Sequence, residues 1–334
     1  MTLFKRKYES GANKLTRLFF ATDLHGSERT FRKFVNCAKF YEVNHLVMGG
    51  DITGKMLIPI VQEGQGRYRV MLQGSSESFD SADALADVKQ RIETIGCYHV
   101  TVGEEELRAM QADPQLTDST FRQLARDRIA RWIALADERL TGTGVNWYVT
   151  GGNDDPPDVL RVLEELQSDH VIYCDGQAVM IDGTYPMASC GYSNPTPWAT
   201  PREVSEGALE RILENAIREV EDFESAIFNL HVPPHDCTLD VCPKLDWSTD
   251  PPTPVVSGGV PETAPAGSTA VRKVVEKYQP LVVVTGHIHE SRGLVKLGRT
   301  TVINPGSEYG EGIIKGCILT LAPGKLAGYQ MTSG

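Results

Sequence analysis

Residues that can bind a metal ion stand at the ends of five short apolar runs in the sequence. The seven are Asp23, His25, Asp51, Asn153, His231, His287 and His289. Two of the runs end in a pair of such residues around one apolar residue, so on an extended backbone both side chains of a pair point the same way. Each piece alone is more typical of a turn or a structural histidine than of a functional site.

As a set, these strand ends predict a metal centre. In open α/β sheets, ligands gather at the carboxyl ends of the strands. Imidazole together with carboxylate suits Zn, Fe, Mn or Ni. Seven such ligands exceed the needs of one ion and are about right for two ions that share a carboxylate, ~3.5–4 Å apart as in two-metal phosphoryl-transfer sites.

Apolar runs separated by helical patterns must position these residues. The runs cover 17–26, 45–54, 146–155, 226–234, 281–290 and 300–308. Because the runs are apolar on both faces, they predict strands covered on both sides, as in an α/β sheet or a layered sandwich. Apolar residues at helical spacing predict helices over 205–225 and 267–278.

Two segments interrupt this alternation. Residues 55–145 contain a hairpin pattern, "RYRVMLQG", and charged helical stretches, which we interpret as a cap inserted between two core strands. Residues 247–267 are rich in Pro and Gly, which predicts a long irregular loop. Length alone allows one large domain or two ordinary ones. We favour a single domain over 1–334 with the insertion at about 55–145.

The composition is that of a soluble globular protein, with 41% hydrophobic and 23% charged residues. No apolar run approaches the ~20 residues that span a bilayer, and no signal-peptide pattern follows the basic N-terminus. Seven scattered cysteines argue against a disulfide framework. We therefore expect a cytoplasmic protein that does not bind membranes. The net charge of −11 argues against an extended nucleic-acid surface but leaves open a nucleotide as a small substrate.

Five motifs occur in a characteristic order: "DLHG", "GGD", "GGND", "NLH" and "GHIH". In this order they resemble the ligand pattern of the calcineurin-like metallophosphoesterases. Further segments, "SNPTPWATPREVSE", "HVPP", "GHIHES" and "INPGSEYGEG", are similar to the prokaryotic branch called Icc-related phosphoesterases. The resemblance covers most of the chain outside about 55–145.

The resemblance implies a fold, a two-metal site and a mechanism. The fold would be an α/β/β/α sandwich of two sheets with an inserted cap. One metal would be held by Asp23, His25 and His289, the other by Asn153, His231 and His287, and Asp51 would bridge them. The nucleophile would be a water or hydroxide between the two ions, which attacks phosphorus in line. The ions stay open among Mn, Fe, Zn and Ni, with manganese the first to test.

One position departs from the family pattern. After the Asn, many members carry a His that contacts the scissile phosphate or protonates the leaving group, and here Asp154 takes its place. Beside two metals a carboxylate is a poor proton donor unless its pKa is strongly raised, so His235 in "HVPPHD" is a second catalytic candidate. For Asp155, loop capping is favoured over orienting a metal-bound imidazole. Asn194 and Trp198 either border a substrate cleft or form a turn with one packed Trp.

These residues indicate metal-dependent hydrolysis of a phosphate ester. A phosphodiester is favoured, because a phosphomonoester carries two charges and often a poor leaving group, for which a proton donor matters most. Two alternatives stay open within enzymes, a phosphomonoesterase and a nucleotide or pyrophosphate hydrolase. A third is a metal-binding scaffold without catalysis. The expected partner is a small phosphate ester, nucleotides included, and no oligomeric state is predicted.

Overall fold

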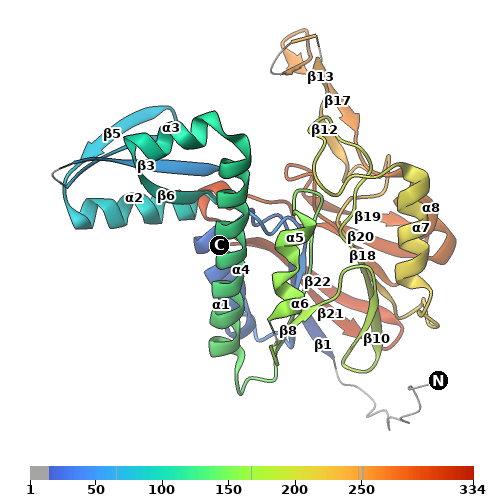
Figure 1. The fold of residues 1–334 in the computed structure, drawn as a ribbon. Helices are drawn as coiled ribbons and strands as arrows, with labels where there is room; N and C mark the ends of the chain where they lie inside the picture. Colours follow the sequence, from blue (N-terminus) through green and yellow to red (C-terminus); the bar gives the residue numbers. More distant parts are fainter. Residues whose placement is uncertain (1–14, 65, 167, 247, 250–251) are drawn as a thin grey trace.

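Two six-stranded β-sheets lie face to face, with helices on the outer side of each (Figure 1). The computed structural model describes residues 15–334 except 65, 167, 247 and 250–251. The N-terminal segment 1–14, where the sequence predicted no signal peptide, lies outside the described residues. In the described part of the chain, every helix is too short or too polar to cross a lipid bilayer.

Most strands of the two sheets are parallel. The first sheet has the order β22 (Lys325–Ser333), β21 (Lys315–Ala322), β1 (Thr16–Ala21), β2 (His45–Gly49), β7 (Asn146–Thr150) and β8 (Val171–Tyr173). The second has the order β19 (Gly293–Leu297), β20 (Thr300–Asn304), β18 (Val282–Val284), β11 (Ile227–Leu230), β10 (Tyr185–Cys190) and β9 (Ala178–Ile181). Strands β1, β2, β7 and β8 are parallel, as are β10, β11, β18 and β20. The carboxyl ends of each parallel set therefore meet at one edge of its sheet.

The strands are apolar on both faces because both faces are covered. In β1, Leu18 and Phe20 belong to the apolar layer between the two sheets. The alternate residues Phe19 and Ala21 belong to the layer between the first sheet and its helices. This alternation confirms the predicted two-sided burial of the strands.

Helices form the two outer layers. Those on the first sheet are α1 (Glu28–Phe40), α4 (Pro114–Leu140), α5 (Pro157–Leu160) and α6 (Val162–Glu165), and those on the second are α7 (Glu206–Ile217) and α8 (Thr269–Tyr278). The predicted helix over 205–225 is shorter in the structure and ends at Ile217. Val220 turns back into the core with its N–H on the Ile217 carbonyl (2.9 Å), and the Asp222 carboxylate accepts the N–H of Ser225 (3.3 Å) in a separate turn.

The segment between β2 and β7 has two parts. A four-stranded sheet with the order β5 (Ser75–Phe79), β4 (Arg67–Leu72), β3 (Leu57–Gly64) and β6 (Tyr98–Gly103) stands apart with α2 (Ala82–Thr94) and α3 (Glu104–Ala112) (Figure 1). It has a small apolar core of its own, which includes Ile60, Val70 and Ile92. By contrast, the second half of α4 packs on the main core, where the Trp132 ring stacks on Phe31 at 4.1 Å between centroids.

The Pro- and Gly-rich segment is a narrow arm rather than the long irregular loop that the sequence predicted. Its described residues form three short antiparallel ladders. These pair β12 (Val241–Pro243) with β17 (Thr263–Pro265), β13 (Leu245–Asp246) with β14 (Thr253–Pro254), and β15 (Val256–Ser257) with β16 (Val260–Pro261). Gly258 and Gly259 turn the tip with φ of 59° and 82°, which suits a two-residue hairpin turn. Prolines themselves occupy paired positions in these ladders, where Pro265 lies opposite Val241, Pro254 opposite Leu245 and Pro261 opposite Val256.

Candidate metal centre

The seven predicted ligand residues lie at the carboxyl ends of five parallel strands. Asp23 and His25 follow β1, Asp51 follows β2, Asn153 follows β7, His231 follows β11, and His287 and His289 follow β18. Because the sheets lie face to face, residues of both reach one cluster. Donor atoms within 4.8 Å of one another form three overlapping groups: Asp23, His25 and His289; Asp23, Asp51 and His231; and His25, Asp51 and Asp154. The site residues themselves stay a prediction, which the geometry supports.

The backbone is strained where it presents these side chains. Asp23, His25, Asp51 and His287 all have φ between 41° and 67°, in the left-handed region. For residues other than Gly this conformation costs about 1 kcal/mol or more each, and it concentrates at functional sites. A Cβ atom on Gly152 would lie 2.1 Å from Asp51 Oδ1, so only glycine lets the two loops approach this closely.

The first group leaves two imidazole nitrogens facing each other. Nε2 of His25 lies 3.2 Å from Nε2 of His289. These atoms also lie 3.5 Å from oxygens of Asp51 and Asp23, respectively. Burial lowers the pKa of His25 to about 3, so this ring is neutral. Burial opposes a charge on His289, but Asp23 outweighs it and raises the pKa of that ring. Both Nε2 atoms are turned inward, where they can bind a proton or a divalent cation.

In the second group, an imidazole nitrogen of His231 faces two oxygen atoms. The ring Nδ1 of His231 lies 2.8 Å from the carbonyl oxygen of Gly49, which can only accept, so Nδ1 carries the proton. In a neutral ring Nε2 then turns its lone pair toward Asn153 Oδ1 (3.0 Å) and Asp51 Oδ1 (3.4 Å). Burial opposes a charge here, but Asp51 and Asp23 outweigh it and raise the pKa of His231 to about 9. The site therefore attracts positive charge, as a proton or as a cation.

Asn153 is held in one orientation by a chain of hydrogen bonds. The hydroxyl of Thr200 lies 2.6 Å from the Glu203 carboxylate, to which it must donate. The same hydroxyl oxygen therefore accepts the Nδ2–H of Asn153 (2.8 Å). The amide oxygen Oδ1 is thus directed at His231 and at Nδ1 of His287 (2.8 Å). An amide oxygen fixed in this way is suited to bind a metal ion.

Asp154 forms an ion pair at the edge of the cluster. Its Oδ2 lies 2.9 Å from Nζ of Lys55 and 3.9 Å from Nδ1 of His25. Burial and the Asp51 carboxylate raise the pKa of Asp154. Burial opposes the charge of Lys55, but Asp154 and Asp51 outweigh it and raise its pKa, so the ammonium is charged at neutral pH. The position thus carries a carboxylate–ammonium pair.

Asp155 acts as the loop cap that the sequence favoured. Its buried carboxylate accepts four hydrogen bonds, from the N–H groups of Ile52 (3.1 Å), Thr53 (2.8 Å) and Gly152 (2.7 Å) and from the Thr53 hydroxyl (2.6 Å). These bonds tie the loop after β7 to the loop after β2. Asp155 therefore holds the loops of Asn153 and Asp51 at a fixed distance. None of these four hydrogen bonds comes from an imidazole.

The remaining candidates lie on neighbouring loops. His235 is partly exposed, with its Nδ1 3.8 Å from Asp240 Oδ2. Asn194 donates to the Ala266 carbonyl (3.3 Å), and Trp198 is 70% exposed. Asn194 and Trp198 belong to the same loop as Thr200. Of these three residues, Thr200 contacts the site, through its hydrogen bond with Asn153. The catalytic role of His235 and the substrate contacts of Asn194 and Trp198 stay predictions.

Three contributors to the site escaped the sequence analysis. They are Lys55, Thr200 and Tyr309, whose ring lies 4.6 Å from that of His25 between centroids. The sequence held a weak signal for each. Lys55 follows the "GGD" motif by four residues, and the other two lie in segments that carry the family resemblance. The "NPGS" turn also braces the site, since the Ser307 hydroxyl donates to the Asp23 carbonyl (2.6 Å).

Sequence comparison finds a relative for part of the chain. No protein-family model matches the chain. Over 150 residues, 44% of this chain, it is 29% identical to the uncharacterized protein MJ1162 of Methanocaldococcus jannaschii, and this match spans only 59% of that protein's length.

Two solved structures share the overall fold. One aligns with a TM-score of 0.53 and 15% identity over 96% of this chain and 99% of its own. The other, TT1561 of Thermus thermophilus, gives 0.50 and 14% over the same shares. A novel archaeal phosphodiesterase aligns with a TM-score of 0.32 and 12% identity over 96% of this chain and 100% of its own. The predicted fold, a two-sheet α/β/β/α sandwich with an inserted cap, is confirmed.

Proposed function

We propose that this protein is a hydrolase of phosphate esters that depends on two divalent metal ions and prefers phosphodiesters. The observation that carries the proposal is the overlap of the ligand groups, because Asp51 and Asp23 each belong to two of them. A carboxylate shared between groups is what two adjacent ions require. The ordered motifs support membership of the calcineurin-like metallophosphoesterases and their Icc-related branch, as a single domain over 1–334 with an insertion at about 55–145.

The donor set fits the ions that the proposal needs. One ion would be held by Asp23, His25 and His289, the other by Asn153, His231 and His287, with Asp51 between them. When bound, such ions lower the pKa of a water nucleophile and neutralise phosphoryl oxygens. Two sets of hydrogen bonds within the chain hold the donors in place. Asp155 accepts from the loops after β2 and β7, and the Thr200 hydroxyl accepts from the Asn153 amide.

The Lys55–Asp154 pair supports a substrate with one negative charge. We assign Lys55 to an oxygen of the bound phosphate, with Asp154 as the residue that positions it (2.9 Å). The pair is neutral as a whole, so it adds no net positive charge for the second anionic oxygen of a monoester. An ion-paired carboxylate is also a poor proton donor, which favours esters with good leaving groups.

The test is an assay on protein first stripped of metal with a chelator. Bis(p-nitrophenyl) phosphate and p-nitrophenyl phosphate are offered separately after reloading with Mn²⁺, Fe²⁺, Zn²⁺ or Ni²⁺. We expect hydrolysis only after reloading and a higher kcat/KM for the diester. Metal content by mass spectrometry should approach two ions per chain.

Other outcomes separate the alternatives. A higher kcat/KM for the monoester would favour a phosphomonoesterase. Two bound ions without turnover of either ester would favour a metal-binding scaffold. Absence of metal binding under all four ions would overturn the proposal.

A further inference from the structure

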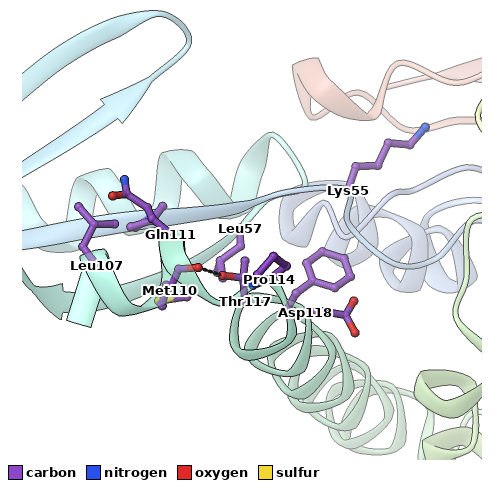
Figure 2. Close-up of a pocket in the computed structure, with 10 residues that line it drawn as sticks. Lys55, Leu57, Leu107, Met110, Gln111, Pro114, Thr117 and Asp118 are labelled. Carbon is purple, nitrogen blue, oxygen red and sulfur yellow. Dashed lines mark hydrogen bonds between the residues drawn. The ribbon is translucent and has the colours of Figure 1, made fainter. Parts of the chain in front are cut away.

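A cavity of about 630 Å³ lies between the inserted sheet and the helices beside it. Strand β3 forms one wall, and α3 and the start of α4 form the others (Figure 2). Most of the lining is apolar, from Leu57, Pro59, Leu107, Met110, Pro114 and Phe121. This volume falls within the range of about 300–1,000 Å³ that is usual for small-molecule sites.

Lys55 connects this cavity to the candidate metal centre. Figure 2 shows Lys55 at one end of the cavity, with its ammonium pointing away from Leu57 and Met110. That ammonium lies 2.9 Å from Asp154, whose carboxylate lies 3.9 Å from His25. The stem of Lys55 thus forms part of the cavity wall while its charge lies at the edge of the metal ligands. A molecule with an anionic and an apolar end can contact both at once.

The charges of the lining exclude a strongly anionic occupant. Of the described residues around the cavity, only Lys55 and Asp118 are charged. Lys55 is already paired with Asp154, and Asp118 is paired with Arg122 (2.6 Å). Among the described lining residues, a polyphosphate chain would find one cation for its several charges, the Lys55 ammonium, whereas an aromatic or aliphatic group would be removed from water.

We propose that this cavity binds the apolar group of the substrate and that the substrate class is phosphate esters with a large apolar substituent. The inference rests on the proposed function, because the phosphate of that substrate would lie at the metal centre. It adds a site that the ligand residues alone do not specify. It also gives the inserted segment a role in the choice of substrate.

The test measures binding, separately from turnover. Methyl(1-naphthylmethyl)phosphinate and dimethylphosphinate are monoanions with no ester bond to hydrolyse, and they differ only in the apolar group. Calorimetry on the Mn²⁺-loaded chain of residues 1–334 should give a Kd for the naphthyl compound that is about tenfold lower or more, from the additional apolar surface buried.

Variants of the cavity lining test whether the preference for the naphthyl compound comes from the cavity. Leu107→Trp fills the cavity and Leu107→Glu places a charge in it, so each should abolish the tenfold preference. Arg108 is exposed on the same helix and does not line the cavity, so Arg108→Trp is the matched control and should retain the preference. Thermal unfolding of each variant shows whether it is folded.

The outcomes distinguish this inference from the proposed function. Hydrolysis of aryl diesters without any naphthyl preference, or a preference that survives both Leu107 variants, would overturn the cavity as the binding site and leave the hydrolase intact. Naphthyl binding that depends on Leu107, without hydrolysis under any metal ion, would support the cavity and overturn the proposed function.

Discussion

The two ends of the β-sandwich each place histidine against aspartate, but in different ways. At the amino ends of the strands, His45 Nε2 lies 3.0 Å from Asp182 Oδ1, and Asp182 Oδ2 accepts the Thr16 hydroxyl (2.6 Å). Donors there meet acceptors. At the carboxyl ends, Nε2 of His25 lies 3.2 Å from Nε2 of His289, and nitrogens and carboxylate oxygens crowd together.

The difference separates a structural polar cluster from a candidate metal site. A histidine–aspartate pair is stable by itself when each proton has one acceptor. Where imidazole nitrogens and carboxylate oxygens crowd together, the cluster attracts positive charge, as a proton or as a cation. The His45–Asp182 pair therefore serves as an internal control. The predictions that follow test the contrast between the two ends of the sandwich.

Removal of the shared carboxylate should have the largest effect. Asp51→Asn should lower kcat/KM for an aryl diester about 1,000-fold, because metal-ion chemistry supplies several kcal/mol of transition-state stabilisation. The matched change at the other end, Asp182→Asn, should leave kcat/KM within about twofold and cost about 1 kcal/mol in the free energy of unfolding. Steady-state kinetics and urea unfolding measure both. Equal kinetic losses in the two variants would break the contrast between the ends.

Asp155 tests whether a buried carboxylate next to the centre can still be structural. Asp155→Ala removes the acceptor of four hydrogen bonds and should lower the free energy of unfolding by about 3 kcal/mol or more, since buried donors are left unpaired. Asp158, an exposed partner of Arg122, provides the control, and Asp158→Ala should cost less than about 1 kcal/mol. Both are read from urea unfolding of metal-free protein. Similar losses in the free energy of unfolding for the two variants would contradict the role of Asp155 in holding the two loops together.

Thr200 tests whether the direction of the Asn153 amide matters. Thr200→Val removes the hydroxyl that accepts from Nδ2 and should weaken binding of one metal ion about 10- to 100-fold, as changes beside metal ligands do. Thr200→Ser retains the hydroxyl and should bind metal nearly as the wild type does. Competition with a chelating dye gives the two affinities. A serine variant as weak as the valine variant would show that the methyl group, and not the hydrogen bond, is responsible.

The smallest effect is expected at Glu206, a carboxylate whose partners are all donors. Burial opposes its charge, but hydrogen bonds from the Ser268 hydroxyl (2.6 Å) and the N–H groups of Ala270 (2.9 Å) and Thr269 (3.0 Å) outweigh it and lower its pKa. The resulting stability is present above pH 4.5, the ordinary value, and is lost as the pH falls through the lower folded value.

Glu206→Gln should therefore cost about 1 kcal/mol or less at pH 7, because the carboxylate is partly exposed. The difference from the wild type should shrink below pH 4.5. Urea unfolding across this pH range measures it, with Glu210→Gln as a surface control. A difference that stays constant with pH would show that the ionised carboxylate is not what stabilises the start of α8.

Much of the fold follows from local pattern. Apolar residues on both faces predicted covered strands, and β1, β2, β7, β11, β18 and β20 begin or end within the predicted runs. The errors lie where tertiary contacts override local preference. The helix predicted over 205–225 ends at Ile217 because Val220 turns into the core, and the prolines of the 247–267 segment did not prevent strand pairing.

The sequence by itself determined which residues can bind metal and placed each of them at a strand end. Residue type and short spacing are local properties, so they could be identified from the chain alone. Which residues meet is different, because Lys55 and Asp154, or Thr200 and Asn153, lie on loops far apart in sequence. Only the packing of two sheets and an inserted segment brings these loops together. The charge pair beside the ligands, the orientation of the amide and the apolar cavity therefore belong to the tertiary structure.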